Sequence, residues 1–279
     1  MPTVQEKRRT FRALHEAGCF VIPNPWDVGS ARYLQSLGFK ALATTSAGLA
    51  FALGRPDAHW AVSRAETLDH IRMLVDATDV PVNADFESGF ADDPDGVGES
   101  VRFCVETGVA GLSIEDLASD GSIYPLEAAV ARIAAARRAI DAAKADVVLV
   151  ARAEASVSDA GALRDVVARL VAFAEAGADC LYAPTAKTGE QISAIVQAVA
   201  PKPVNVLAGS AASLPPAELA ALGVRRVSLG AALARAAWSG FMAVAKELAT
   251  SGTLTSLGSA ASYAELNAFF VDDQKRKPA

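Results

Sequence analysis

The feature that most constrains the fold is a regular alternation of short β-rich runs with longer segments of helical spacing. Eight β-rich runs recur along the 279 residues, at 19–22, 40–44, 80–84, 111–114, 147–151, 180–183, 203–207 and 225–229. Segments with apolar residues three and four positions apart separate them, at 28–37, 63–77, 95–107, 126–143, 159–176, 189–199 and 215–222. This alternation predicts a parallel sheet with right-handed helical crossovers.

Eight such units can close into a (β/α)8 TIM barrel, which is the fold we expect. An open, doubly wound sheet is the alternative. Neither G-x-G-x-x-G after the first strand nor G-x-x-x-x-G-K-[ST] occurs in the sequence, and this absence lowers the nucleotide-binding alternative. Glycines directly after several of the helical segments suit the left-handed cap of a helix end.

The chain after the eighth run predicts a helical extension. We expect one barrel domain over residues 1–279, in which residues 231–279 form a C-terminal helical extension of the same domain. Within it, 231–249 and 262–270 indicate two helices with strongly apolar faces. Such faces often pack on a neighbouring subunit, so a homo-oligomer, a dimer or tetramer, is expected.

Composition restricts the class of protein and its partners. With 52% hydrophobic and 21% charged residues, the chain predicts a soluble protein with a substantial core. A net charge of −6 with interspersed signs argues against nucleic-acid and membrane partners and favours small molecules. No apolar stretch approaches 18 residues and the N-terminus is charged, so a cytoplasmic location is expected. Three scattered cysteines and three scattered histidines argue against disulfides, zinc and histidine chemistry.

Two acids crowd the end of the third predicted strand, in NADFESGF at 83–90. In an extended segment, alternate side chains share a face, so Asn83, Asp85 and Glu87 would point the same way. Carboxylates that lie so near each other raise each other's pKa unless a proton, a cation or water lies between them. Taken alone, the octapeptide could equally be a frayed strand end with both acids in solvent.

The neighbouring strand ends favour a shared site. Active sites of these barrels lie at the C-terminal ends of the strands. Glu115 and Asp116 follow the fourth predicted strand, and Arg152 and Glu154 follow the fifth. Oxygen ligands without histidine or cysteine suit Mg²⁺, with Mn²⁺ possible. Arg152 could also be a buried counter-ion for the acids, which is compatible with a role in the site.

At these residues the sequence resembles the isocitrate lyase/phosphoenolpyruvate mutase superfamily. The matching segments lie between about residues 20 and 207: the stretch from NPWDVG to GRPD at 24–57, VPVNADFESGF at 80–90, GLSIED at 111–116 and VARAEA at 150–155. The resemblance implies a (β/α)8 barrel whose C-terminal helices are exchanged between subunits, usually in a tetramer. It also implies Mg²⁺ and small 2-oxo, 2-hydroxy or enolpyruvyl carboxylate substrates.

Carried over position by position, the resemblance makes Asp85 the direct metal ligand. Glu87, where the family usually has aspartate, and Glu115 would hold the metal through its water ligands. Such enzymes pass through a pyruvate enolate or a relative of it, so a magnesium ion and Arg152 would stabilise the oxyanion.

The resemblance also implies a substrate site. Backbone and hydroxyl groups after the second strand would grip the substrate carboxylate, and Arg152 would bind substrate oxygens. Asn205, at the end of the seventh strand, could contact substrate or bond backbone in the upper layer of the barrel. The expected substrate-binding residues are Trp26, Thr45, Ser46, Ala47, Asp57, Asp85, Arg152 and Asn205.

The chain departs from the family directly after Glu115. Lyases of the family carry a Lys/Arg-Cys-Gly-His loop with a catalytic cysteine, and the mutase has a lysine and an asparagine in its gating loop. Residues 116–125 read DLASDGSIYP and contain no cysteine, histidine, lysine or asparagine. Proton-transfer candidates are Tyr124, Ser122, Asp116 and metal-bound water, although Ser122 with Gly121 could simply form the turn of a lid. The expected catalytic residues are Arg152, Glu115 and Tyr124.

These observations predict a Mg²⁺-dependent lyase or hydrolase that cleaves a C–C bond in a small 2-oxo or 2-hydroxy carboxylate through an enolate. One alternative is cleavage or rearrangement of a C–P bond in a phosphonopyruvate-like substrate, although a phosphonate would want basic partners in the loop. The other alternative is a barrel that binds 2-oxo acids without catalysis.

Overall fold

The computed structural model of the chain describes residues 2–58 and 60–276. The chain divides into two compact units, Met1–Ala232 and Leu233–Ala279.

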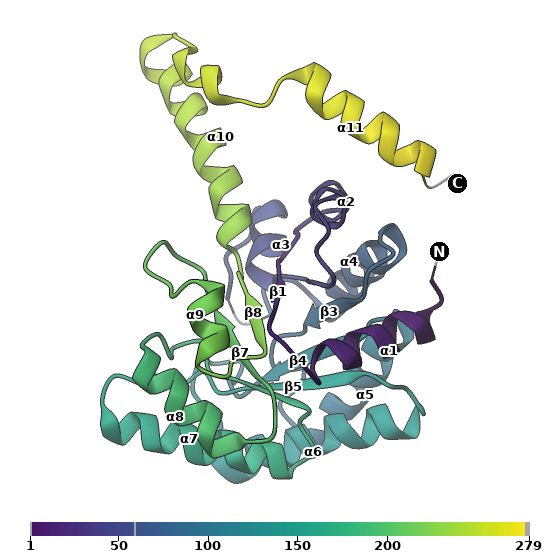
Figure 1. Cartoon of the computed structure of the whole chain (residues 1–279), viewed down its shortest axis with the longest axis vertical. Coiled ribbons are helices and arrows are strands. Elements are labelled where there is room, and N and C mark those ends of the chain that lie inside the picture. The colour runs from purple at the N-terminus through teal and green to yellow at the C-terminus, as the bar shows by residue number, and fades with distance from the viewer. Residues whose placement is uncertain (1, 59, 277–279) are drawn as a thin grey trace. The chain divides into compact units, whose positions relative to one another are not determined.

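The first unit is a ring of eight parallel strands in the order β1-β8-β7-β6-β5-β4-β3-β2 (Figure 1). Ala43 N–H donates to the Pro23 carbonyl at 3.1 Å, which joins the chain segments of β1 and β2. Sequential strand order confirms the (β/α)8 barrel and rules out the doubly wound sheet. The strands are β1 (Phe20–Ile22), β2 (Leu42–Ala43), β3 (Val82–Asp85), β4 (Gly111–Glu115), β5 (Val148–Arg152), β6 (Cys180–Tyr182), β7 (Val204–Leu207) and β8 (Arg226–Ser228).

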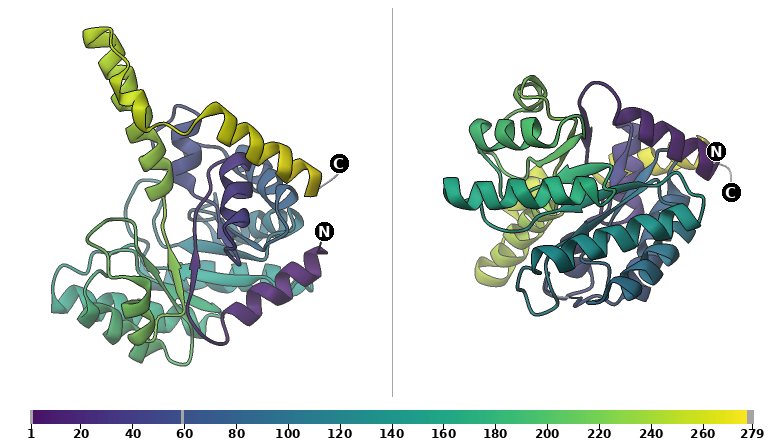
Figure 2. Two further views of the ribbon diagram at one scale, coloured as in Figure 1. Left: turned by 45° about the horizontal axis from the view of Figure 1, so that its top comes forward. Right: turned by 90° about the horizontal axis from the view of Figure 1, so that it is seen from below.

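Helices lie outside this ring (Figures 1 and 2). Several begin at side-chain caps that the sequence supplies, such as Asp27, Ser63 and Thr188, each of which forms a capping box. The helices of the first unit are α1 (Val4–Leu14), α2 (Val28–Ser36), α3 (Ser46–Ala52), α4 (Arg64–Ala77), α5 (Pro94–Glu106), α6 (Leu126–Ala142), α7 (Ala160–Glu175), α8 (Gly189–Val199) and α9 (Pro216–Ala221).

Helix α3 was not expected from the sequence. It begins one residue after its cap Thr45, whose hydroxyl accepts from Gly48 N–H. At seven residues it is too short, and its sequence SAGLAFA too uniformly apolar, to show a helical period. Its position matters for the site because it directly follows β2.

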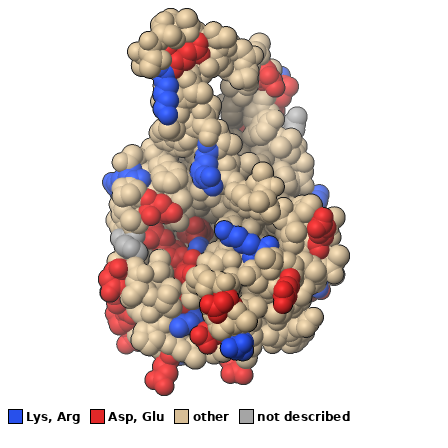
Figure 3. All heavy atoms as spheres, turned by 90° about the vertical axis from the view of Figure 1, so that its left-hand side faces the viewer, with Lys and Arg blue, Asp and Glu red and all other residues tan. Residues whose placement is uncertain are grey.

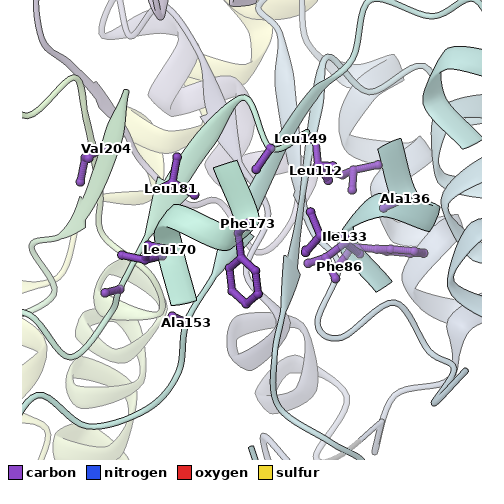
Figure 4. Packing of buried hydrophobic residues seen from close by; sticks show 14 of the residues in the cluster. Phe86, Leu112, Ile133, Ala136, Leu149, Ala153, Leu170, Phe173, Leu181 and Val204 are labelled. Atoms are coloured by element: carbon purple, nitrogen blue, oxygen red, sulfur yellow. The ribbon is translucent and has the colours of Figure 1, made fainter. Parts of the chain in front are cut away.

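The core has two layers. Between strands and helices, Phe86, Phe173, Leu112 and Leu149 are fully buried with their neighbours (Figure 4). Inside the ring, Phe11 of α1 packs with a smaller group of side chains from five strands, Ile22, Ala43, Val148, Val150, Cys180 and Tyr182 among them. The narrow ring interior therefore leaves little room at the level of Phe11.

The second unit contains α10 (Ala232–Ser251, beginning at the last residue of the first unit), the 3₁₀ helix η1 (Thr255–Ser259) and α11 (Tyr263–Arg276). The two helices predicted after the eighth strand are present, and the last three residues of the predicted extension, 277–279, lie outside the described residues. On α10, the large apolar side chains of Trp238, Phe241 and Leu248 are 40–62% exposed. Among the described residues, no helix has the length and apolar character needed to cross a membrane.

Gly111, the first residue of GLSIED, provides a test of the packing inside the ring. A Cβ at this position would lie 2.5 Å from Phe11 Cε1 and 2.7 Å from Asn83 Oδ1, and both neighbours are buried. We expect Gly111→Ala to lower the free energy of unfolding by about 1–3 kcal/mol through overpacking. Urea denaturation measures the change.

Gly98 of α5 is the matched control, because the nearest atom to an added Cβ is 3.7 Å away. Gly98→Ala should leave the free energy of unfolding unchanged or raise it by up to about 1 kcal/mol, because glycine in a helix interior is less stable than alanine. Equal stability of the two variants would contradict the tight packing at Gly111.

Candidate active site

Three consecutive strands end in charged residues that meet at one edge of the ring. Asp85 ends β3, Glu115 ends β4 and Arg152 ends β5, and Glu115 is in register with Arg152. The Arg152 guanidinium donates to Asp85 Oδ1 at 2.7 Å and to Glu154 Oε1 at 2.8 Å, and lies 3.1 Å from Glu115 Oε2. One cation therefore joins carboxylates from three segments.

The second oxygen of Asp85 is held from the β2 side. Ser46 donates both its backbone N–H and its hydroxyl to Asp85 Oδ2, each at 2.9 Å. Asp85 N–H in turn donates to Thr44 Oγ1 at 2.8 Å. Helix α3 places Ser46 here, so the unexpected helix fixes the orientation of the expected metal ligand.

Two adjoining cavities open among these residues. The first, of about 210 Å³, is lined by residues that include Thr45, Ser46, Ala47, Asp57, Asp85 and Arg152. The second, of about 220 Å³, is lined by Ser46, Asp57, Ala58, Trp60, Glu87, Ser88, Glu115, Leu117, Ala118, Arg152 and Glu154. Acidic side chains gather around a hollow on the face shown in Figure 3. Ser46, Asp57 and Arg152 line both cavities and so connect them.

The buried acids of this site are poorly neutralised. Burial raises the pKa of Glu115 to about 8, with Arg152 opposing and nearby carboxylates adding to the rise. Burial, followed by repulsion from Asp85, raises the pKa of Glu87 to about 7. Burial also raises the pKa of Asp57. Burial alone would lower the pKa of Arg152, but the nearby carboxylates hold it well above its ordinary value. The acids outnumber the cation, so a further cation would stabilise their ionised forms.

The structure corrects the expectation that Glu87 shares a face with Asn83 and Asp85. Strand β3 ends at Asp85, and Glu87 has a φ of +46°. This left-handed residue breaks the alternation that an extended strand would impose. Glu87 therefore lines the second cavity, where Trp60 N–H donates to its Oε2 at 3.3 Å. Gly89 also has a left-handed conformation, with a φ of +84°.

The donor set suits a hydrated magnesium ion. Among the described residues, no three His, Cys, Asp or Glu side chains are grouped closely enough to ligate one metal ion together. The sequence predicted only one direct ligand, Asp85, with Glu87 and Glu115 acting through water. Mg²⁺ keeps several of its waters in proteins and prefers oxygen donors. The residues present therefore fit this ion, and their metal roles remain predictions.

Three predicted residues lie outside both cavities. The Tyr124 hydroxyl donates to Asp92 Oδ1 at 2.5 Å, and its ring stacks 4.0 Å from the Arg132 guanidinium. The Trp26 carbonyl bonds His70 Nε2 at 2.9 Å. Neither cavity is lined by these side chains, so the geometry adds no support to their predicted roles.

Asn205, the third, is occupied within the ring. Its amide oxygen accepts from Arg226 Nε at 2.9 Å, and its amide nitrogen donates to Ser228 Oγ at 3.0 Å. Its side-chain partners are therefore residues of β8, and neither cavity is lined by Asn205.

The segment after Glu115 forms a short hairpin. Leu117 and Ile123 pair in an antiparallel bridge, and Gly121 turns the chain with a φ of +85°. Ser122 is exposed and binds Asp120. Asp116 is 2% exposed and accepts from Glu154 N–H at 2.8 Å, so it positions the segment that carries Glu154. Burial raises the pKa of Asp116 to about 6.

Sequence reasoning missed four polar residues that line the first cavity from within the ring: Asn24, Ser113, Arg226 and Ser228. Arg226 is the notable omission because it is charged and 3% exposed. A signal was present in the tandem Arg225-Arg226 of the eighth strand, since alternation must place one of two adjacent strand residues inside the ring.

Comparison with known proteins identifies relatives over most of the chain. The family of phosphoenolpyruvate phosphomutase matches residues 11–249. An uncharacterized protein of Mycobacterium tuberculosis is 31% identical over 269 residues, which cover 96% of this chain and 98% of that protein. Oxaloacetate decarboxylase of Paraburkholderia xenovorans is 30% identical over 82% of this chain and 77% of its own length.

A solved structure shows the same architecture. The crystal structure of a protein from Burkholderia cenocepacia J2315, provisionally named a lyase/mutase, has a TM-score of 0.89 and 46% identity, and the match covers 96% of both chains. Together with the strand-end acids and the barrel, these matches show that the chain belongs to the isocitrate lyase/phosphoenolpyruvate mutase superfamily.

Proposed function

We propose that the protein is a Mg²⁺-dependent lyase or hydrolase that cleaves a C–C bond in a small 2-oxo or 2-hydroxy carboxylate through an enolate. The observation that carries the proposal is the position of Arg152. Its guanidinium joins Asp85, Glu115 and Glu154 where the two cavities meet. Oxaloacetate decarboxylase and 2-methylisocitrate lyase, two relatives of the chain, carry names that fit this class of reaction.

Different residues of the site would bind the substrate, stabilise the enolate and hold the metal ion. Thr45, Ser46 and Ala47 line the first cavity at the start of α3 and would bind the substrate carboxylate. Arg152 would stabilise negative charge on the enolate oxygen, an electrostatic contribution that is usually among the largest in catalysis. Asp85, with Glu87 and Glu115 through water, would hold Mg²⁺, which as a Lewis acid polarises a carbonyl oxygen.

The loop after β4 is relevant to whether a C–C bond or a C–P bond is cleaved. Its residues Leu117 and Ala118 line the second cavity, and both are apolar. Apart from Arg152, the described residues that line this cavity include no basic side chain. A phosphonate substituent carries several negative charges and needs basic partners, so these residues favour C–C over C–P cleavage. A phosphonopyruvate hydrolase structure with oxalate and Mg²⁺ nevertheless has a TM-score of 0.83 and 26% identity to this chain, so phosphonopyruvate belongs in any assay.

A substrate screen tests the proposal. The purified protein is incubated with Mg²⁺ and, separately, oxaloacetate, methylisocitrate, isocitrate and phosphonopyruvate, and release of pyruvate, glyoxylate, oxalate or phosphate is followed. We expect turnover of at least one substrate with C–C cleavage. Phosphate release alone would support C–P chemistry, and binding of 2-oxo acids without turnover would support a non-catalytic barrel.

Removing the direct ligand tests the metal site. We expect Asp85→Ala to weaken Mg²⁺ binding by more than about 100-fold, because changes to outer-shell groups alone already cost about 10- to 100-fold in metal affinity. Calorimetric titration with MgCl₂ measures the affinity, and circular dichroism confirms folding. Asp95→Ala, which removes an exposed acid of α5, is the matched control and should bind Mg²⁺ as the wild type does. Equal affinities of the two variants would contradict the assignment.

The buried acids predict a pH dependence of stability. Glu87 and Glu115 have pKa values of about 7 and about 8 in the folded protein against 4.5 ordinarily. Between pH 4.5 and about 8 these two groups therefore bind more protons in the folded state than in the unfolded state, whereas His15, whose pKa burial lowers to about 3 from 6.5, has the opposite effect below about pH 6.5. The free energy of unfolding of the metal-free protein should therefore fall as pH rises from 6.5 to about 8, and Mg²⁺ should reduce the fall.

Urea denaturation with EDTA or with saturating MgCl₂ measures this dependence. Glu115→Gln cannot ionise, so it should show a smaller fall than the wild type in EDTA. Stability that rises from pH 6.5 to about 8 in EDTA, or an equal fall in Glu115→Gln and the wild type, would contradict the pKa assignments.

We further propose that the protein is a homo-oligomer, a dimer or tetramer. The exposed apolar side chains of α10 support this proposal, because contiguous exposed apolar surface usually marks an interface. Light scattering should give a mass above that of one chain. Phe241→Asp, at a 62% exposed position, should lower it, whereas Ser239→Asp, also on the exposed part of α10, should not. A monomeric wild type would contradict the proposal.

A further inference from the structure

The first cavity contains a second guanidinium that the proposed chemistry does not use. Arg226 is the first residue of β8 and is in register with Asn205 of β7 and Phe20 of β1. Its side chain points into the ring, since it lines the cavity and is 3% exposed. The ring therefore encloses two arginines, Arg152 at the strand ends and Arg226 at the start of β8.

The two arginines differ in their partners. Arg152 is surrounded by three carboxylates, whereas Arg226 Nε donates to Asn205 Oδ1 at 2.9 Å and Nη1 donates to Asn83 Oδ1 at 3.2 Å. Both of these acceptors are neutral amides. Among the described residues, no carboxylate forms an ion pair with Arg226.

Such an arrangement is costly without a ligand. A buried guanidinium loses its hydrogen bonds to water, and the amide oxygens replace only part of that stabilisation. The site therefore retains a preference for an anion. Asn83 and Asn205 hold the planar group from β3 and β7, and no group among the described residues accepts a hydrogen bond from Nη2. Ser113, Tyr182 and Ser228 add hydroxyl groups around the same cavity. These features describe a preformed pocket for an oxyanion.

We propose that Arg226 forms the floor of the substrate cavity and binds a second carboxylate of the substrate, so that dicarboxylic acids are preferred over monocarboxylic ones. This inference rests on the proposed function, because the first carboxylate and the oxo or hydroxy group would occupy the Ser46–Arg152 end of the same cavity. A planar guanidinium can bind a carboxylate through two parallel hydrogen bonds, which fixes both its distance and its orientation.

A matched ligand pair isolates the second carboxylate. Malate and lactate are both 2-hydroxy acids, and malate carries one additional carboxylate. Calorimetry with saturating Mg²⁺ should show that the wild type binds malate at least about tenfold more tightly than lactate. A hydrogen bond between charged groups typically contributes an affinity gain of this size. Arg226→Met should remove most of this preference and leave lactate affinity unchanged. Arg226→Lys retains the charge without the planar fork and should keep an intermediate preference.

Arg225→Met is the control variant. Arg225 precedes Arg226 on the strand but lies outside the ring, where it donates to the Gly18 carbonyl. It should show the wild-type preference for malate. Equal loss of both ligands in Arg226→Met would overturn the inference, because it would indicate a general structural or electrostatic role.

Wild-type measurements separate this inference from the proposed function without relying on a variant. A wild type that binds lactate and malate equally with Mg²⁺ would overturn the role of Arg226 alone. A wild type that binds neither acid and turns over no substrate in the screen would overturn both.

Discussion

The site depends on the ion-pair cluster around Arg152. Three carboxylates approach one guanidinium because three adjacent parallel strands end at the same level, and the in-register pairing of Glu115 with Arg152 fixes that level. Buried ion pairs of this kind contribute little net stability, since desolvation offsets most of the attraction. The cluster is better understood as an arrangement for binding and charge stabilisation, maintained by a barrel whose core lies elsewhere.

That arrangement could be predicted from sequence where it depends on strand periodicity. The eight β-rich runs locate the strands, and topology places Asp85, Glu115 and Arg152 at neighbouring strand ends. The prediction failed where the backbone leaves regular structure. Glu87 adopts a left-handed conformation, and α3 forms within a uniformly apolar stretch, so neither follows from periodicity. Arg226 was missed for another reason: a charged residue in an interior strand position contradicts the rule that such positions are apolar.

The position of Tyr124 is explained by a contact outside the barrel ring. Arg132 of α6 is 1% exposed and donates to the carbonyls of Ser88, Ala91 and Asp92, and the Tyr124 ring stacks on the same guanidinium. The Arg132 side chain therefore connects the loop after β3 with the hairpin after β4. Tyr124 is held in this contact and does not line the second cavity, whereas Leu117 and Ala118 of the same hairpin do. The hairpin residues that line that cavity have no ionisable side chain, which is the structural counterpart of the sequence departure at 116–125.

The distribution of charge within the cavities orients a ligand. Asp57, Glu87, Glu115 and Glu154 line the second cavity together with apolar loop residues, so an anionic group would be repelled there unless a cation intervened. At the other end, Arg226 offers a positive group whose partners are neutral. A substrate anchored near Ser46 and Arg152 would thus direct a negative substituent toward the interior of the ring and a neutral one toward the hairpin. Under the proposed function, the substituent that each cavity accepts would then decide which bond is broken and which group leaves, so the hairpin without basic residues and the additional arginine in the ring would act together.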